Sequence, residues 1–215
     1  MKLIKLAAGA LITLSSLTAQ AGFLQISGGA SSPVLGNNFY QGSLNPQVYN
    51  IGGQLQSAFD GILSLDFTYL GHEAGWKNTF TSSSLLTAAS GSIDTVLPSP
   101  FFGYFDDYTI GENLTFSFST NGTPVPNFVN NGSNTNGDYS VSFATALETT
   151  FNGNWYDAIL FFDDTGGFMD DDNHDDLVIG VRVLDATTRT VPESSTLALM
   201  MMGLLGLFAA RRMKA

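Results

Sequence analysis

Cysteine is absent from the 215 residues of this chain. Its absence excludes disulfide bonds, thiol-based catalysis and metal sites with cysteine ligands. The length leaves room for about one domain of ordinary size between two terminal segments that have the character of targeting signals. A domain of this kind has to be stabilised by its hydrophobic core.

Basic residues are scarce outside the two ends of the chain. Between residues 22 and 190 there are eighteen acidic residues but only three basic ones, Lys77, Arg182 and Arg189. The formal charge of this part is therefore about −15. Nucleic-acid binding needs Lys and Arg to displace the counterions of the phosphates. We expect no nucleic-acid partner, and the charge favours solubility, cation binding or both.

Histidine is also rare, which limits acid–base and nucleophilic catalysis. His72 and His174 are the only imidazoles and the G-x-S-x-G motif is absent, so a Ser-His-Asp site would have to be assembled by the fold. Paired carboxylates can serve a glycoside hydrolase, and Asp106 with Asp107 is the obvious pair. An acidic turn after an aromatic strand is the simpler interpretation. We expect a protein that is not an enzyme.

Apolar residues do not recur at helical spacing between residues 22 and 185. They alternate with polar residues instead, as in Leu63–Tyr69, Leu114–Ser119 and Tyr139–Phe143. This alternation is typical of half-buried strands that carry their aromatic side chains on one face. The sequence therefore predicts a single all-β domain over residues 22–185, an antiparallel β-sandwich or jelly roll.

Two segments between the targeting signals are expected to contain no strand. The residues Gly122–Gly137, GTPVPNFVNNGSNTNG, are rich in Gly, Asn and Pro and predict one long loop. Ala186–Thr190 predicts a short hydrophilic linker, residues 186–190, after the last strand.

Long apolar runs occur at the two ends of the chain. The first follows Lys2 and Lys5, covers Leu6–Leu17 and precedes Ala19–Ala21, a small-x-small site for signal peptidase. Its apolar core is shorter than the ~20 residues that a membrane span needs. Residues 1–21 therefore predict a secretory signal peptide, used by the Sec export machinery and removed by signal peptidase.

The second run covers Leu197–Ala210 and reaches the lower length limit of a bilayer span when residues from about 195 are included. The basic residues Arg211, Arg212 and Lys214 follow at once. They predict a membrane stop that keeps the C-terminus in the cytoplasm and the acidic domain outside. We expect a transmembrane helix over about residues 195–210.

A V-P-E motif precedes this helix. Its residues are Val191, Pro192, Glu193, Ser194, Ser195 and Thr196. The motif, the apolar helix and the terminal basic cluster together resemble, over residues 191–215, the PEP-CTERM sorting signal of Gram-negative bacteria. That signal usually starts V-P-E-P-S-T, so Ser194 stands where the family has a second proline.

The PEP-CTERM resemblance implies export and sorting. It implies recognition by an exosortase, a membrane-embedded cysteine protease, and cleavage near the Pro-Glu motif. The domain would be anchored transiently in the inner membrane and then delivered to the cell surface or extracellular matrix. Such proteins are associated with exopolysaccharide and biofilm formation.

The segment Asn154–Asp185 predicts an acidic β-hairpin. Its strands are expected at Trp155–Phe162 and Leu177–Leu184, and the loop between them, Asp163–Asp176, holds seven aspartates in fourteen residues. Adjacent carboxylates at ~4 Å repel by about 1 kcal/mol even in bulk water. An ordered loop would therefore need a neutralising partner. The alternative is a solvated acidic turn, since Asp and Asn favour turns without any ligand.

Oxygen-rich ligands without sulfur favour hard cations such as Ca²⁺. The residues Asp171–Asp175 repeat the D-x-[DN]-x-[DN] start of a calcium loop. The loop is not an EF-hand, because Asp176 stands where that motif requires Gly and Arg182 stands where it requires Glu.

The hairpin also resembles the closing hairpin of a bacterial extracellular domain family of unknown function. The family pattern runs F-E-D, a short turn, then D-x-D-x-N-D before an apolar strand. The resemblance extends to Asp66–Phe80, DFTYLGHEAGWKNTF, which looks like the strand and E-A-G-x-x-N turn of such domains. On that pattern Asp164 falls in the first acidic pair, and Asp171, Asn173, Asp175 and Asp176 fall in the second cluster. All five carry oxygen donors, so they are the candidate ligands of a Ca²⁺ site.

Aromatic residues near Asp106 permit a further interpretation. Phe101, Phe102, Tyr104 and Tyr108 could stack on sugar rings, as in a carbohydrate-binding module built on a β-sandwich. This function needs no tuned pKa, in contrast to catalysis. We therefore expect an exported surface or matrix protein, with a module that binds exopolysaccharide as the alternative and a glycoside hydrolase as a third interpretation.

Overall fold

The computed structural model describes residues 22–34, 38, 40–96, 100–122, 127–135, 140–165 and 173–188. The predicted signal peptide, sorting motif and C-terminal helix lie outside these residues. No helix within the described part of the chain is long and apolar enough to cross a membrane.

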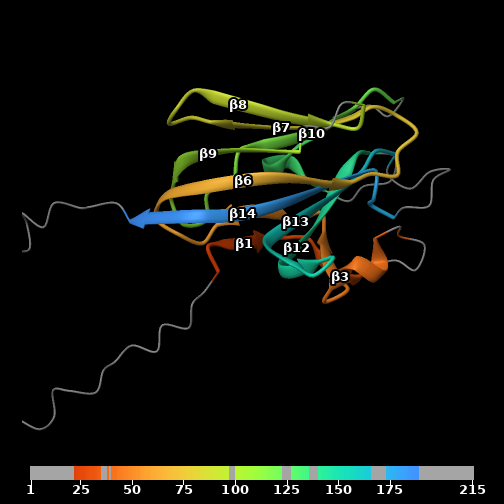
Figure 1. Cartoon of the computed structure of the whole chain (residues 1–215), viewed down its shortest axis with the longest axis horizontal. Helices are drawn as coiled ribbons and strands as arrows, with labels where there is room; N and C mark the ends of the chain where they lie inside the picture. The colour runs from red at the N-terminus through yellow and green to blue at the C-terminus, as the bar shows by residue number, and fades with distance from the viewer. Residues whose placement is uncertain are drawn as a thin grey trace, which may run out of the picture.

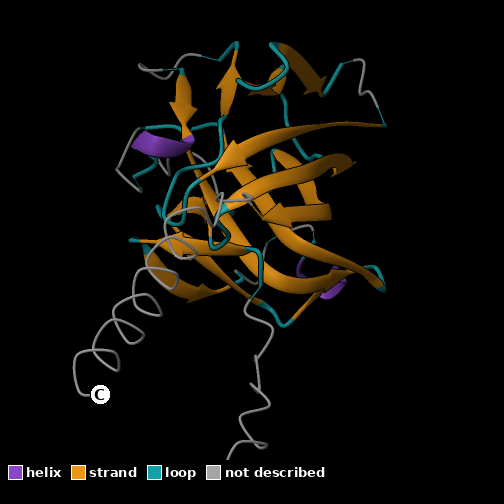
Figure 2. Cartoon of the chain, turned by 90° about the vertical axis from the view of Figure 1, so that its left-hand side faces the viewer, coloured by secondary structure: helices purple, strands orange, loops and turns teal. Residues whose placement is uncertain are grey.

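Strands make up most of the described structure (Figure 2). They are β1 (Leu24–Ser27), β2 (Ala30–Pro33), β3 (Leu44–Asn45), β4 (Val48–Ile51), β5 (Gln54–Ser57), β6 (Gly61–Gly71), β7 (Asn78–Ser84), β8 (Ala89–Asp94), β9 (Phe101–Tyr108), β10 (Phe116–Thr120), β11 (Phe128–Asn130), β12 (Ser142–Phe151), β13 (Asn154–Asp163) and β14 (Leu177–Thr188). Two short 3-10 helices are η1 (Gln41–Ser43) and η2 (Asn131–Ser133).

The described strands form two main sheets. An eight-stranded sheet has the order β2-β4-β12-β13-β14-β6-β9, with β3 paired to β12, and a four-stranded sheet has the order β11-β10-β7-β8. The strands β1 and β5 form a separate pair, and the strand pairings in all three sheets are antiparallel. Figure 1 shows β7, β8 and β10 as a layer beside β6 and β14. The prediction of an all-β antiparallel sandwich is confirmed.

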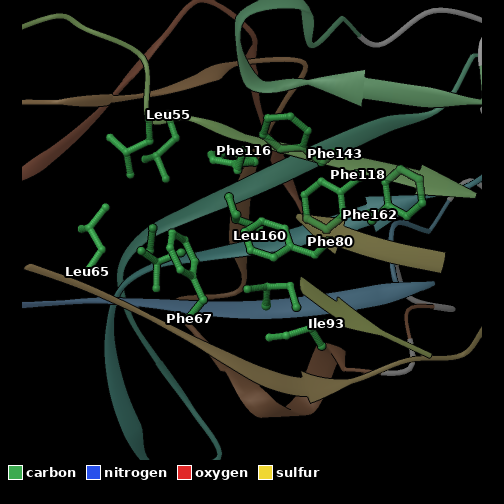
Figure 3. Packing of buried hydrophobic residues seen from close by; sticks show 14 of the residues in the cluster. Leu55, Leu65, Phe67, Phe80, Ile93, Phe116, Phe118, Phe143, Leu160 and Phe162 are labelled. Carbon is green, nitrogen blue, oxygen red and sulfur yellow. The ribbon is translucent and has the colours of Figure 1, made fainter. Parts of the chain in front are cut away.

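The main core lies between the two sheets. In β6 the predicted alternation places Leu63, Leu65 and Phe67 inside, each fully buried. The rings of Phe118 from the small sheet and Phe162 from the large sheet stack with centroids 4.9 Å apart and an angle of 6°. Figure 3 shows them among the other aromatic side chains of this cluster. Each fully buried large apolar side chain contributes about 1.5–3 kcal/mol to folding.

The middle of the large sheet is buried on its other face as well. Ile159, Phe161 and Val178 belong to a second apolar cluster, which Tyr40 and Tyr49 cover from residues 34–51. Burial on both faces explains why β13 is a nearly continuous apolar run rather than an alternating one. The expectation of one buried face was therefore incomplete for β13 and β14.

The predicted single loop over Gly122–Gly137 is wrong for part of its length. It contains β11 and η2, because Val129 is buried and pairs with Phe118 of β10. The buried amide of Asn131 adds hydrogen bonds to the carbonyls of Leu55 and Leu114, at 2.6 and 2.8 Å. These long-range partners hold the segment against the sheet despite its turn-rich composition.

Three strand boundaries also differ from the prediction. Strand β14 continues to Thr188, into the predicted linker, because its last residues pair with Gly61–Leu63 of β6. Strand β10 begins at Phe116 rather than Leu114, whose amide instead donates to the carbonyl of Leu55 at 3.0 Å. Strand β12 begins at Ser142, later than the predicted start at Tyr139, a residue that is not described.

Candidate functional site

The loop that joins β13 to β14 carries four of the five predicted metal ligands in the described structure. Asp164, Asn173, Asp175 and Asp176 are exposed by only 3, 5, 2 and 8%. The fifth, Asp171, lies outside the described residues. Burying a carboxylate is costly unless it is hydrogen-bonded or paired. The described part of this loop is therefore packed against the protein, and it is not a solvated acidic turn.

Asp164 and Asp176 are joined through backbone and side-chain hydrogen bonds. The backbone N–H of Asp164 donates to Oδ2 of Asp176 at 2.8 Å. The Asp176 N–H donates to the carbonyl of Phe162 at 3.0 Å, which continues the pairing of β13 with β14. The Asp176 carboxylate thus closes the loop across its neck.

Asn78, at the start of β7, fastens this neck to the small sheet. Its Nδ2 donates to Oδ2 of Asp164 at 2.6 Å and makes a longer bond of 3.4 Å to the carbonyl of Asp176. Asn78 is completely buried. It is the last residue of the E-A-G-x-x-N turn, so the sequence motif contained the signal for this contact.

Two further segments meet the same loop. The N–H of Glu73, in the turn after β6, donates to the carbonyl of Asp175 at 3.0 Å. The side-chain amide of Asn38 donates to the carbonyl of Asn173. The two stretches that carry the resemblance to the extracellular domain family are therefore in contact, because β6 and β14 are neighbours in one sheet.

The two basic side chains of the described residues are engaged elsewhere. Nζ of Lys77 lies 3.3 Å from Oδ2 of Asp94, and the guanidinium of Arg182 lies 4.5 Å from the ring centre of Tyr156. Within the described residues, no group of three or more His, Asp or Glu side chains is arranged to hold a metal ion. The hydrogen bonds described above at the neck of the loop come from backbone and side-chain amides.

His174 lies in the loop but packs into the protein. It has a φ of +54°, is 1% exposed, and its ring lies 5.8 Å from that of Tyr49. Its Nε2 is 3.2 Å from Oγ of Ser142, a residue that is itself fully buried. This serine–histidine pair is closed to substrate in the structure.

The two carboxylates considered for a hydrolase are not brought together. Asp106 is 3% exposed, and its carboxylate accepts hydrogen bonds from the N–H groups of Leu85, Leu86 and Asp107. It thereby anchors the turn between β7 and β8 to β9. Asp107 is exposed on the opposite face of β9, because successive side chains of a strand alternate.

The same alternation divides the aromatic residues of β9. Tyr108 is buried, and Phe102 and Tyr104 pack partly buried against the main core. Of the predicted stacking residues, only Phe101 points outward, with 64% of its surface exposed. Phe105, 47% exposed on the same face, was missed although it lies four residues further along the strand.

A gap separates these two outward rings. Gly103 lies between Phe101 and Phe105 and pairs with Asp66 of β6. A Cβ at Gly103 would lie 2.8 Å from the carbonyl oxygen of Leu65, so a larger residue fits poorly there. The face therefore has a ring, a glycine with the Asp66 carboxylate beside it, and a second ring about 13 Å along the strand. We call Phe101, Gly103 and Phe105 the β9 aromatic face.

The structure thus defines an antiparallel β-sandwich whose closing hairpin is acid-rich and, in its described part, buried. Residues 190–212 match the family model of the PEP-CTERM protein-sorting motif. The chain therefore carries a PEP-CTERM signal and is an exported exosortase substrate with a transient membrane anchor at its C-terminus. The comparisons with curated proteins and with solved structures gave no match.

The matched segment contains most of the predicted sorting residues. All six residues of Val191–Thr196 fall inside it, together with Arg211 and Arg212, while Lys214 lies just beyond it. The sorting resemblance drawn from the sequence is confirmed. These residues lie outside the described structure, so the match is one of sequence.

Proposed function

We propose that the exported domain is a non-enzymatic component of the cell surface or extracellular matrix, associated with exopolysaccharide and biofilm. The PEP-CTERM match at residues 190–212 carries this proposal, because the signal serves to sort a domain outward. The large negative charge of residues 22–190 supports it, since like-charged domains stay soluble after release.

This location is tested by determining at which residue the protein ends when it is recovered from the native host. Protein recovered from the surface or matrix fraction should end within Val191–Thr196, as measured by intact mass. An exosortase deletion should keep the chain in the membrane fraction with Ala215 intact. Recovery of full-length protein from the matrix, or of processed protein from the periplasm alone, would contradict the proposal.

Ser194 offers a variant for the same experiment. Ser194→Pro restores the proline usual in the family and fixes φ near −65°, so the recognised backbone is more preorganised. The processed fraction should rise relative to the parent chain. Ser195→Ala, one residue further on, serves as the matched control that leaves backbone stiffness unchanged.

We also propose that Ca²⁺ stabilises the closing hairpin. The calcium-like spacing of Asp171–Asp175 and the burial of Asp164, Asp175 and Asp176 support this proposal. The ion would draw on Asp171, and on Asn173 as a neutral oxygen donor. Extracellular sites of this kind bind at ~10⁻⁴ to 10⁻³ M.

The calcium proposal is tested by thermal unfolding. At a Ca²⁺ concentration about ten times the Kd, binding stabilises the folded state by about 1.4 kcal/mol, which raises Tm by a few degrees. Mg²⁺ at equal ionic strength should do less, and Asp171→Asn should reduce the shift. An equal Tm in Ca²⁺ and in chelator would rule out the site.

A second candidate function is a carbohydrate-binding module, favoured by the β9 aromatic face. Two outward rings separated by a glycine suit the stacking of sugar units along a chain. Ser64 and Thr68 of β6 pair with Phe105 and Phe101 and add hydroxyl groups beside the rings. These hydroxyls, and the carboxylate of Asp66 between them, would hydrogen-bond to sugar hydroxyls.

Pull-down with exopolysaccharide from the native host tests this candidate. Phe101→Ala with Phe105→Ala should abolish retention, whereas Trp155→Ala, which removes an aromatic side chain that is 53% exposed on β13, should not. Retention by the double variant would refute the module. Turnover of the polysaccharide would overturn the non-enzymatic assignment and favour a hydrolase.

A further inference from the structure

A second polar site lies on the four-stranded sheet. A pocket of 410 Å³ is formed where β7, β10 and η2 meet. Thr81 and Ser117 pair across β7 and β10 and line it. Their side chains face away from those of Phe80 and Phe118, which enter the core between the sheets. The pocket therefore belongs to the outer face of the small sheet, away from the β9 aromatic face.

Most residues of the lining carry a hydroxyl or an amide group, and none of the described residues that form it is charged. Thr81, Ser83, Thr115 and Ser117 contribute four hydroxyls, none of which is hydrogen-bonded to another described residue. Asn130 adds an exposed side-chain amide at the edge. Leu114 and Phe116 also belong to the lining, but their side chains are buried in the core between the sheets. Hydroxyl and amide donors and acceptors are therefore open to a ligand.

The wall of the pocket is held by a buried asparagine. Asn131 is 1% exposed and uses its whole side-chain amide: Nδ2 donates to the carbonyls of Leu55 and Leu114, and Oδ1 accepts from the N–H of Leu55 at 2.8 Å. This clamp fixes η2 against β5. The carbonyl of Gly132 then accepts from Nε2 of Gln54 at 3.2 Å.

Paired amides beside Gly132 hold the same side of the pocket. Nε2 of Gln56 donates to Oδ1 of Asn113 at 3.0 Å, and Nδ2 of Asn113 donates to Oε1 of Gln54 at 3.2 Å. Oγ of Ser82 donates to the carbonyl of Thr115. The pocket is thus preformed by contacts within the protein, which lowers the entropy lost when a ligand binds.

The chemistry of the lining selects a class of ligand. Anionic ligands lack a Lys or Arg partner there and are repelled by a domain of about −15 charge. Metal ions lack carboxylates in the lining, and purely apolar ligands would leave the hydroxyls unpaired. The volume lies within the range of about 300–1,000 Å³ that is usual for small-molecule sites. A neutral, polyhydroxylated ligand satisfies all of these conditions.

We propose that this pocket binds one or two units of a neutral oligosaccharide. The proposal rests on the proposed function only for the source of the sugar, an exopolysaccharide around the cell. The hydroxyls of Thr81, Thr115 and Ser117 donate to and accept from sugar hydroxyls, and the side-chain amide of Asn130 adds a donor and an acceptor at the edge. Binding here is independent of Phe101 and Phe105.

Amide chemical shifts of the purified exported protein test the pocket. Cellobiose, maltotriose and mannobiose serve as neutral probes, and digalacturonate serves as an acidic probe. At least one neutral probe should shift the amides of Thr81, Ser117 and Asn130 in a saturable way, and digalacturonate should bind more weakly. Failure of all three neutral probes, or tighter binding of the acidic one, would overturn the proposal.

A pair of isosteric substitutions identifies the site. Thr81→Val with Thr115→Val removes two hydroxyls without changing volume, and both hydroxyls lack a partner within the described protein, so folding should be retained. Affinity should fall at least about tenfold, since each lost hydrogen bond contributes roughly 1 kcal/mol.

The matched control is Thr79→Val, which changes the same strand and face outside the pocket. It should leave affinity unchanged. Unaltered affinity in the pocket double variant would overturn the proposal, as would loss of binding in Phe101→Ala with Phe105→Ala, because the sugar would then lie on the β9 aromatic face. Sorting and matrix location are read from the C-terminal mass and do not depend on this result.

Discussion

Asn78 is the residue that connects the closing hairpin to the small sheet. Its side-chain amide donates to the carboxylate of Asp164 at 2.6 Å in a fully buried position. Hydrogen bonds to charged groups contribute about 1.5–3 kcal/mol, and removing one partner inside a protein costs more than removing it at the surface. The contribution of this residue to stability should therefore exceed that of an ordinary strand asparagine.

We predict that Asn78→Ala lowers the free energy of unfolding by about 2–3 kcal/mol, because Asp164 loses a buried donor. Urea denaturation followed by circular dichroism measures the change. Asn154→Ala is the matched control at an exposed position, where the only side-chain bond is 3.5 Å long, and it should change stability by less than about 0.5 kcal/mol. Equal effects of the two substitutions would show that the hairpin does not depend on Asn78.

Three tyrosines that are wholly or partly buried make stability sensitive to alkali. Burial raises the pKa of Tyr40, Tyr104 and Tyr108 well above the ordinary value of 10.0. Nearby acidic groups raise these pKa values further, with Asp106 close to Tyr104 and Tyr108. The folded state therefore holds protons that the unfolded chain loses at high pH.

The sign of the pH dependence follows from these raised pKa values. Their contribution to stability is fully present below the unfolded pKa of about 10 and is lost as pH rises from there towards the folded values. We predict a steady fall of the urea midpoint above about pH 10, with ionisation of these tyrosines, seen by tyrosinate absorbance, coinciding with unfolding. Reversible ionisation of all seven tyrosines near pH 10 in a folded protein would contradict this.

At the scale of elements, the sandwich is joined by aromatic contacts between β10 and β13. Phe118 and Phe162 are each fully buried, and their rings stack at 4.9 Å. Phe118 also lies within 5.1 Å of Phe80 from β7. Strands β10 and β13 belong to different sheets. Substitutions in the Phe118–Phe162 stack therefore measure how much packing between the sheets contributes to stability.

Phe118→Ala should destabilise the protein by about 3–5 kcal/mol, since it removes a buried ring and leaves a cavity. A double-mutant cycle with Phe162→Ala should give a coupling energy of about 0.5–1.5 kcal/mol beyond the loss of buried area. Phe101→Ala, at a position that is 64% exposed, is the control and should change stability little. A coupling near zero would mean that the two sheets respond independently.

The strands differed in how much of each could be predicted from the sequence. The alternation in β6 was read correctly, because each residue there has one face in the core and one outside. Strand β11 and the end of β14 could not be read, because their pairing partners lie in β10 and β6 rather than in the local sequence. The outward direction of Phe105 was readable from the period of two, but only once the start of β9 was known.

At the scale of the whole molecule, charge opposes compactness. Residues 22–190 carry about −15 in formal charge, and the described part contains one ion pair, Lys77 with Asp94. Repulsion within such a domain destabilises the folded state, and salt screens it over a Debye length of about 10 Å at 0.1 M. Stability should therefore depend on ionic strength as well as on any specific cation.

Raising NaCl from about 10 mM to 0.5 M should increase the free energy of unfolding by about 1 kcal/mol, measured from urea midpoints at constant pH. The same series in choline chloride separates screening from specific cation binding and should give the same slope. A fall in the midpoint with salt would show that attractive charge pairs outweigh repulsion. Calcium added at constant ionic strength then reports on the closing hairpin alone.

The sequence by itself determined export, the sorting signal and the all-β class, because targeting segments and strand alternation are written in contiguous residues. The V-P-E motif with its departure at Ser194 needs no fold to be recognised. Only the tertiary structure decided which polar groups meet. Asn78 reaches Asp164, and hydroxyls of β7 and β10 share one pocket, because sheet register brings distant residues together. That register depends on packing of the whole core, which no short stretch of sequence contains.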